Sequence, residues 1–393
     1  MIHDVNKYEI MKTKNQHILS YLPLHIRNRG IGYAAHSLAL GMNQDGLRSD
    51  IISIRNDMSS SSTHAYQGIP SKLIYSLRTK LQPYSYIINS TESKFIKLSK
   101  KYEMIHLWPG SNLATVKELK AQNKLIIIEN INCHQLISKR ILEAESKRLG
   151  TKVYNFTDDD IAYESKVLNL ADFVFSPSPQ VTASLIEAEV PEERILESSY
   201  GLGSNALVPL ERIKNKAHSD FTALFVGSII ARKGVHLLLD YWRSANINGK
   251  LKIIGRIAPH MEKIIEPYLN DPKIEFIPYT SDLYEHYVTA DLFVMPSLEE
   301  GSPLVTYLAI GAGLPCLVSP MAGDGVVTNN VEGFIVDPHH KDSWVEYLRA
   351  LYDDNKLRYR LAIGAREKAD YFLWENVAAR RAEQILDISV SLT

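Results

Sequence analysis

The chain has 393 residues, of which 45% are hydrophobic and 23% are charged, and its formal net charge is -1. This length exceeds what one ordinary hydrophobic core supports, so two domains are expected. The composition is typical of a globular enzyme, and the balanced charge gives no general attraction to nucleic acid. The two cysteines, Cys133 and Cys316, lie far apart in the sequence. They predict neither a disulfide framework nor a zinc site, and a reducing cytoplasm fits them best.

The sequence shows no pattern typical of targeting or of membrane insertion. Residues 1–16 are polar and of mixed charge, unlike a signal peptide. Apolar runs stay shorter than the roughly 18 residues that cross a bilayer. We therefore expect a cytoplasmic protein whose contact with a membrane, if it has one, is peripheral.

Short apolar runs typical of buried strands occur in two series, separated mostly by segments of helix length. Parallel, doubly wound α/β sheets have this alternation. A glycine-containing, then polar and basic stretch at about 201–220 is the expected linker, and residues 356–386 are expected to be helical. The first series of strands is expected at 17–22, 50–54, 104–107, 125–128, 173–175 and 195–198, and the second at 223–226, 251–254, 274–277, 292–295, 316–318 and 334–336.

The first strand of the second series leads into a loop suited to phosphate. Residues 223–226 are followed by Gly227, then by Arg232 and Lys233, and a helix is expected to begin near Val235. Helix N-termini favour phosphate, and a lysine there adds positive charge for a diphosphate. The alternative is that both basic side chains are solvated residues beside a turn.

An acidic loop follows the expected strand at 292–295. Glu299 and Glu300 precede an apolar, helix-like segment and a further strand at 316–318. Open α/β sheets bind ligands at the carboxyl ends of their strands, so this loop is a candidate ligand site. Glu299 is expected to be a solvated loop carboxylate. For Glu300 the alternative is an acid stabilised at a helix N-terminus.

The stretch from Glu300 to Pro303 and its setting resemble the donor-sugar signature of retaining glycosyltransferases of family four, which have the GT-B fold. The resemblance implies two Rossmann-like α/β domains that face each other across a cleft. Residues 1–203 would form the acceptor-side domain and residues 204–370 the domain that binds the nucleotide sugar. A C-terminal helix at about 370–393 would pack back on the first domain.

The resemblance also implies a set of site residues. Glu300 would accept hydrogen bonds from the donor sugar, and Lys233 matches the lysine of the family's phosphate loop. Two positions depart from the family pattern, because Ser228 stands where the family has arginine and Leu308 where it has a second glutamate that binds ribose. Arg232 would supply the charge missing at Ser228. The expected catalytic residues are Glu300 and His134, and the expected donor-binding residues are Gly30, Gly32, Ser228, Arg232, Lys233, Ser302, Pro303, Leu304, Val305 and Leu308.

In the first domain, Gly30 and Gly32 follow the first strand and resemble the family's glycine-rich first loop, which approaches the donor diphosphate. The alternative is that they are ordinary turn glycines. His134 follows the strand at 125–128, where family members often carry a histidine close to the donor sugar. It would orient a sugar hydroxyl or move a proton. A buried, hydrogen-bonded histidine is the alternative.

Two other patterns are expected to carry no chemistry. Asp158, Asp159 and Asp160 follow Thr157 at the start of a helical pattern, so they are interpreted as helix N-terminal acids rather than metal ligands. His339 and His340 lie in a polar loop without partners in metal-ligand spacing. No metal and no other cofactor is expected to be required.

Residues 72–101 combine seven basic side chains with apolar and aromatic ones. Such a segment can dock on anionic lipid, each basic residue adding on the order of 1 kcal/mol near the surface. The alternative is a solvated helix face.

The sequence therefore predicts an enzyme that moves a sugar from a nucleoside diphosphate sugar to a glycan or lipid-linked acceptor, with retention. Surface polysaccharide or glycoconjugate biosynthesis is its expected setting. A non-catalytic GT-B subunit that acts as a binding or chaperone partner is the alternative, because Ser228 and Leu308 depart from the family pattern. A phosphorylase on the same fold is a third hypothesis.

Overall fold

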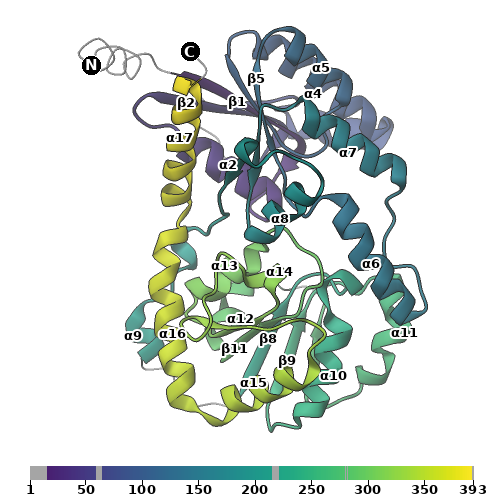
Figure 1. The fold of residues 1–393 in the computed structure, drawn as a ribbon, viewed down its shortest axis with the longest axis vertical. Coiled ribbons are helices and arrows are strands. Elements are labelled where there is room, and N and C mark those ends of the chain that lie inside the picture. The colour runs from purple at the N-terminus through teal and green to yellow at the C-terminus, as the bar shows by residue number, and fades with distance from the viewer. Residues whose placement is uncertain (1–15, 59–63, 215–220, 279, 281, 392–393) are drawn as a thin grey trace.

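The computed structural model describes residues 16–58, 64–214, 221–278, 280 and 282–391. They form two α/β units, and the final helices run along both (Figure 1). The expectation for residues 1–16 lies almost wholly outside the described residues, as do residues 215–220 of the expected linker. No helix within the described ranges combines the length and apolarity of a membrane span.

The first sheet has seven parallel strands in the order β3-β2-β1-β4-β5-β6-β7. Both of its faces are covered. Along β1, Ile18 and Leu22 belong to one buried apolar cluster, whereas Leu19 and Tyr21 belong to another. The strands are β1 (Gln16–Ile26), β2 (Leu47–Asn56), β3 (Ala65–Gln67), β4 (Met104–Leu107), β5 (Leu125–Glu129), β6 (Phe173–Ser176) and β7 (Ile195–Glu197).

The second sheet has six parallel strands in the order β10-β9-β8-β11-β12-β13. The predicted doubly wound α/β class is therefore confirmed. The sequence analysis missed only β3, an edge strand of half-buried residues without an apolar run. The strands of this sheet are β8 (Thr222–Val226), β9 (Lys250–Ile254), β10 (Ile274–Ile277), β11 (Leu292–Met295), β12 (Cys316–Val318) and β13 (Gly333–Ile335).

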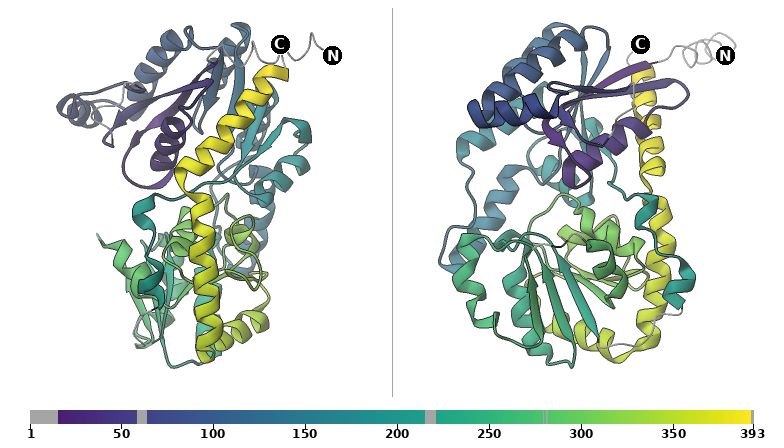
Figure 2. Two further views of the ribbon diagram at one scale, coloured as in Figure 1. Left: turned by 90° about the vertical axis from the view of Figure 1, so that its left-hand side faces the viewer. Right: turned by 180° about the vertical axis from the view of Figure 1, so that it is seen from behind.

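Helices follow most strands, and the two units are stacked end to end (Figure 2). Those from α2 to α8 belong to the first unit, and those from α9 to α16 to the second. They are α2 (Gly30–Gly41), α3 (Lys72–Leu81), α4 (Tyr84–Ser99), α5 (Leu113–Ala121), α6 (Gln135–Leu149), α7 (Asp158–Leu170), α8 (Pro179–Glu187), α9 (Leu210–Lys214), α10 (Val235–Ala245), α11 (Glu262–Ile265), α12 (Leu283–Thr289), α13 (Leu304–Gly311), α14 (Pro320–Gly323), α15 (Lys341–Asp353), α16 (Asn355–Ala369) and α17 (Trp374–Ser391).

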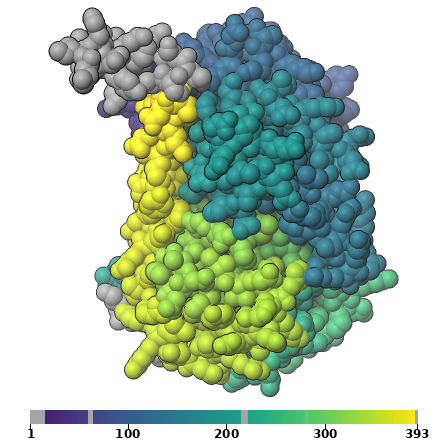
Figure 3. All heavy atoms as spheres, viewed as in Figure 1, coloured from purple at the N-terminus to yellow at the C-terminus, as the bar shows by residue number. Residues whose placement is uncertain are grey.

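The chain passes between the two units twice, and the two passages lie side by side. Leu202 forms a parallel bridge with Leu373, and its N–H donates to the carbonyl of Phe372 at 3.0 Å. From there α17 returns to the first unit, where it packs on α2 and forms the column seen at the edge of the molecule (Figure 3). The sheet changes between β7 and β8, while the domain limits at 203 and 370 stay predictions.

A buried ion pair holds α17 to the first sheet. Arg381 Nη1 and Nη2 lie 2.7 and 3.1 Å from the two carboxylate oxygens of Glu129, and neither side chain is exposed. His106 Nε2 lies 3.0 Å from Glu129, and Arg381 Nε donates to Ser198 Oγ at 2.7 Å. Burial works to raise the pKa of Glu129, but Arg381 and His106 outweigh it and lower that pKa to about 2.

We expect Arg381→Met to lower the free energy of unfolding by about 3–5 kcal/mol, because it leaves the Glu129 carboxylate buried and unpaired. Urea denaturation at neutral pH measures the loss. In the unsubstituted chain, the stabilisation from Glu129 is present above the ordinary carboxyl pKa and is lost as pH falls towards about 2.

The neighbouring Arg380→Met is the control. Arg380 donates to the Tyr371 carbonyl at 3.0 Å, and that loss should cost only about 1 kcal/mol. Adding Glu129→Gln to Arg381→Met should recover part of the stability. Equal losses for Arg380→Met and Arg381→Met would contradict a structural role for the buried pair.

Candidate active site

The two charged loops of the second unit lie side by side. β8 and β11 are neighbouring parallel strands, so the loops at their carboxyl ends meet at one edge of the sheet. The first loop passes through a 3-10 turn, Ala231–Lys233, into α10, and the second leads into α13. Gly234 permits their close approach, because its φ is +66° and a Cβ there would lie 1.9 Å from the Pro296 carbonyl oxygen.

Four charged side chains from these loops form one group, the four-charge cluster of Arg232, Lys233, Glu299 and Glu300. Lys233 Nζ lies 2.5 Å from Glu300 Oε1, and Arg232 Nη1 lies 2.9 Å from Glu299 Oε2. Arg232 Nη2 is also 3.7 Å from Glu300 Oε1. Each cation is therefore held beside a carboxylate at the edge where ligands of such sheets bind.

The interpretation of Glu299 as a solvated loop carboxylate is wrong. Glu299 is 3% exposed and Glu300 is 6% exposed, and Glu299 lines a cavity between the two units. The sequence alone could not show this, because the burial arises from the first unit and from Arg232. Arg232 and Lys233 are likewise largely buried rather than solvated beside a turn.

Burial and pairing oppose each other in the cluster. Burial disfavours the carboxylate form and raises the pKa of Glu299, although Arg232 works in the opposite direction. Burial also works to lower the pKa of Arg232, but the charges of Glu300 and Glu299 outweigh it and raise that pKa. The guanidinium is therefore a permanent positive charge beside Glu299, whose carboxyl burial makes costly to ionise.

The first unit closes over the acidic loop. A Cβ at Gly301 would lie 1.7 Å from the Ile131 carbonyl oxygen, so only glycine fits there. Ser178 Oγ donates to the Gly301 carbonyl at 2.5 Å, and Cys133 Sγ donates to the Glu300 carbonyl at 3.4 Å. The loop after β5 thus meets the loop that carries Glu300.

His134 lies in this loop but serves as the N-cap of α6. It is 1% exposed, and its Nδ1 accepts from the Leu136 N–H at 3.2 Å. Its Nε2 is 3.3 Å from Ser165 Oγ and 3.6 Å from Glu164 Oε2. Burial lowers the pKa of His134, which favours the neutral ring. This geometry matches the buried, hydrogen-bonded alternative, and the catalytic role of His134 stays a prediction.

Gly30 and Gly32 lie at the start of α2, after β1. Gly30 has a φ of +61°, and a Cβ at Gly32 would lie 3.2 Å from the Ile26 Cα. Neither glycine makes a hydrogen bond to the four-charge cluster. Their contact with a donor stays a prediction.

The expected donor-binding residues around α13 have different surroundings. Ser302 Oγ lies 2.7 Å from the Tyr307 hydroxyl in the core, so its side chain is already engaged. Pro303 is the N-cap of α13, so Leu304 and Val305 present first-turn N–H groups that have no partner within the helix. The donor-binding role of these residues stays a prediction.

The two positions that depart from the family pattern contribute no charge here. Ser228 is exposed in the loop after β8. Leu308 lies on α13, half-buried and packed against the core. Arg232 and Lys233 are therefore the basic side chains that this loop brings to the cluster.

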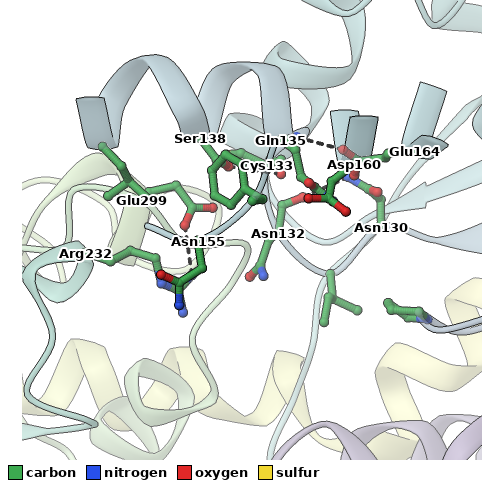
Figure 4. Close-up of a pocket in the computed structure, with 14 residues that line it drawn as sticks. Asn130, Asn132, Cys133, Gln135, Ser138, Asn155, Asp160, Glu164, Arg232 and Glu299 are labelled. Atoms are coloured by element: carbon green, nitrogen blue, oxygen red, sulfur yellow. Dashed lines mark hydrogen bonds and ion pairs between the residues drawn. The ribbon is translucent and has the colours of Figure 1, made fainter. Parts of the chain in front are cut away.

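A cavity of about 640 Å³ adjoins the four-charge cluster (Figure 4). Arg232 and Glu299 form one wall, and loops and the helices α6 and α7 of the first unit form the others. Asn155 and Glu164 were not predicted as site residues, because they come beside Arg232 and Glu299 only through the fold. The lining residues are Pro109, Asn130, Ile131, Asn132, Cys133, Gln135, Ser138, Leu142, Asn155, Phe156, Asp160, Glu164, Arg232 and Glu299.

The interpretation of Asp158–Asp160 as helix N-terminal acids is confirmed. Thr157 is the N-cap of α7 and forms a capping box with Asp160, whose pKa is lowered by hydrogen bonds from Thr157. His339 lies beside Glu145 and Arg148. Within the described ranges, no group of three His, Cys, Asp or Glu side chains could hold a metal ion.

The second unit is similar to a known protein family. Residues 209–368 match the model of the family described as glycosyl transferases group 1. The similarity to this family therefore lies in the second unit. The predicted family resemblance is confirmed.

The wider similarity covers the fold. HepE of Anabaena, solved with UDP and glucose, is similar over 94% of this chain and 99% of its own, with a TM-score of 0.67 and 13% identity. This likeness confirms the GT-B fold of two Rossmann-like domains.

Curated relatives match part of this chain. A D-inositol 3-phosphate glycosyltransferase of Pseudarthrobacter chlorophenolicus is 28% identical over 40% of this chain and 41% of its own. The capsular polysaccharide biosynthesis glycosyltransferase CapM of Staphylococcus aureus is 25% identical over 42% of this chain and 47% of its own. The chain thus spans less than half the length of these two relatives.

We expect Glu300→Gln to strengthen the binding of a nucleoside diphosphate by about three- to tenfold. The substitution removes the charge that competes with a phosphate for Lys233, and tenfold corresponds to about 1.4 kcal/mol. Calorimetric titration with UDP, GDP and ADP measures the change.

The control is Glu275→Gln, an exposed residue of β10, which should leave nucleotide affinity unchanged. Unchanged or weaker nucleotide binding in Glu300→Gln would show that Lys233 need not leave Glu300 when a diphosphate binds.

Proposed function

We propose that the chain is a glycosyltransferase that moves a sugar from a nucleoside diphosphate sugar to a glycan or lipid-linked acceptor, retaining the anomeric configuration. The observation that carries this proposal is the four-charge cluster at the carboxyl ends of β8 and β11. It lies within the residues that match the group 1 family. HepE, which has the same fold, was solved with UDP and glucose.

In this proposal the cluster exchanges partners when the donor binds. The diphosphate takes Lys233 and Arg232, and Glu300, released from Lys233, accepts hydrogen bonds from the donor sugar. The bond from the anomeric carbon to the diphosphate breaks while the acceptor oxygen forms a new bond and loses its proton. Fixed cations in a closed site stabilise the negative charge that develops on the leaving diphosphate.

We also propose that no metal ion and no other cofactor is required. Arg232 and Lys233 place two positive charges where the diphosphate would lie, and these can balance its charge. Activity should therefore persist in the presence of a chelator.

The setting we propose is surface polysaccharide or glycoconjugate synthesis at the cytoplasmic face of a membrane. CapM, one of the relatives, is named for capsular polysaccharide biosynthesis. The non-catalytic alternative has Ser228 and Leu308 in its favour, but the retained cluster supports an enzyme.

The exposed face of α3 supports a peripheral membrane contact. None of the residues of α3 is buried, and Leu73, Leu77 and Leu81 are 80%, 55% and 71% exposed. Spaced four residues apart, they share one side of the helix. Arg78 and Lys80 lie between Leu77 and Leu81 in the sequence of this helix. Apolar and basic groups therefore occur together, as they do on lipid-binding helices.

The test of the function is release of free sugar from a panel of UDP-, GDP- and ADP-sugars, which needs no acceptor. Lys233→Ala should weaken nucleoside diphosphate binding about ten- to a hundredfold, since a charge-assisted contact is worth about 1.5–3 kcal/mol. Sugar release should fall with it.

The matched control is Lys356→Ala, an exposed lysine of α16 in the same domain, which should behave like the unsubstituted chain. Full activity of Lys233→Ala, or no release from any donor in the panel, would contradict the proposal.

The membrane contact is tested by sedimentation with vesicles. Binding should require anionic lipid and weaken with salt, because basic side chains contribute to it. Replacing Leu73 and Leu81 with serine should reduce binding at least about tenfold, as two apolar contacts are lost. Leu269→Ser, at a 47% exposed leucine of the second domain, is the control. Equal binding of both variants would leave α3 as a solvated helix.

A further inference from the structure

The cavity beside the four-charge cluster has the size and lining of a sugar site. Its volume of about 640 Å³ lies within the range of about 300–1,000 Å³ that is usual for small-molecule sites. Phe156, Leu142, Pro109 and Ile131 provide apolar surface against which the carbon-bound face of a sugar ring can pack. The cavity lies where the first unit meets Arg232 and Glu299, beside the proposed donor site (Figure 4).

The polar lining is rich in amides. Asn130, Asn132, Asn155 and Gln135 line the cavity, and an amide both donates and accepts hydrogen bonds, as a sugar hydroxyl does. Oε1 of Gln135 is buried and has no hydrogen-bond partner within the described ranges. A buried acceptor without a partner is costly, and a bound hydroxyl would satisfy it.

The charged lining is mainly negative. Asp160, Glu164 and Glu299 face a single cation, Arg232. Arg232 is already paired with Glu299 at 2.9 Å, so the charges of Asp160 and Glu164 have no cation within the cavity wall to balance them. A phosphate or carboxylate group entering here would meet like charge, whereas a neutral or amine-bearing group would not.

Glu164 is positioned to contact a ligand. Its Oε2 accepts from the Gln135 N–H at 2.8 Å, which fixes the carboxyl at the start of α6. Its Oε1 makes no hydrogen bond to any described residue, so it remains available. Burial raises the pKa of Glu164 to about 7, and the negative charge of Glu299 also raises it. The hydrogen bond from Gln135 works in the opposite direction.

We propose that this cavity binds the end of the acceptor and selects an uncharged or amine-bearing sugar over a phosphorylated or acidic one, with Glu164 as a specificity-determining residue. The proposal rests on the proposed function, because it names the acceptor class of the same site. One relative is named for D-inositol 3-phosphate. The carboxylates that line the cavity of this chain instead favour an acceptor without a phosphate group.

The test is ligand-observed NMR with methyl glucoside, methyl 2-amino-2-deoxyglucoside and methyl glucoside 6-phosphate as probes and with UDP present. The pH is about 8, above the pKa of about 7 of Glu164, so that its carboxyl is ionised. The neutral and amino probes should bind, and the phosphorylated probe should bind at least about tenfold more weakly. Glu164→Gln should reduce that discrimination by about threefold or more, because it removes one of the repelling charges. UDP affinity, measured in parallel, verifies that the variant is folded.

The matched control is Glu118→Gln, an exposed residue of α5 outside the cavity, which should leave all three affinities unchanged. Two results would overturn the proposal: phosphorylated probe binding as tightly as the neutral one, or no binding of the neutral and amino probes. An unchanged discrimination in Glu164→Gln would overturn the role of Glu164.

Sugar release from donors separates this proposal from the proposed function. Normal donor turnover with preference for the phosphorylated probe means that the acceptor class alone is wrong. Absence of turnover from every donor, with the expected order of probe binding, means that the cavity binds sugars but the proposed transfer fails.

Discussion

The buried pair of Glu129 and Arg381 links the parts of the molecule that build the site. Glu129 ends β5, and the loop that follows it carries Asn130, Asn132 and Cys133 into the cavity. Arg381 comes from α17, which the chain adds after the second domain is complete. Since neither side chain is exposed to water, losing one charge would leave the other buried and unpaired. The last helix therefore holds the first domain at the orientation in which this loop reaches Gly301 and Glu300.

The four-charge cluster shows how two buried cations can be stable beside two carboxylates. Arg232 and Lys233 would be costly to bury alone, and Glu299 and Glu300 balance them. The same pairing sets a condition on the proposed donor binding, because a diphosphate would have to compete with the carboxylates for both cations. Release of Glu300 by the diphosphate would make the carboxylate available to the sugar at the time when the sugar is present.

Contacts between the domains continue away from the site. Glu145 of α6, which is 2% exposed, lies 2.7 Å from His236 of α10. Gln180 of α8 donates to Asp324 at 2.6 Å. His236 is two residues beyond Gly234, in the first turn of the helix that follows the Ala231–Lys233 turn. The first domain thus contacts this helix as well as the loop that carries Glu300 and Gly301, and the cavity is lined from both domains.

The sequence by itself determined the two sheets, their parallel strands and the two charged loops. The reason is local, because most strands contain a short apolar run and each charged loop follows its strand directly, as with Val226 and Lys233 or Met295 and Glu300. It also indicated the capping role of Asp160, which depends on a residue three positions away. β3 was not predicted from the sequence, because an edge strand of half-buried residues needs no apolar run.

Tertiary structure alone decided the burial of Glu299, the burial of His134 and the lining of the cavity. Each of these depends on residues distant in sequence: Glu299 is buried by Arg232 and the first domain, and Asn155 and Glu164 meet Arg232 only after the domains dock. A side chain beside a strand end can be solvated, paired or structural, and its own neighbours in the sequence do not distinguish these states. The surface that packs against the side chain distinguishes these states, because it excludes water and sets the charge next to the side chain.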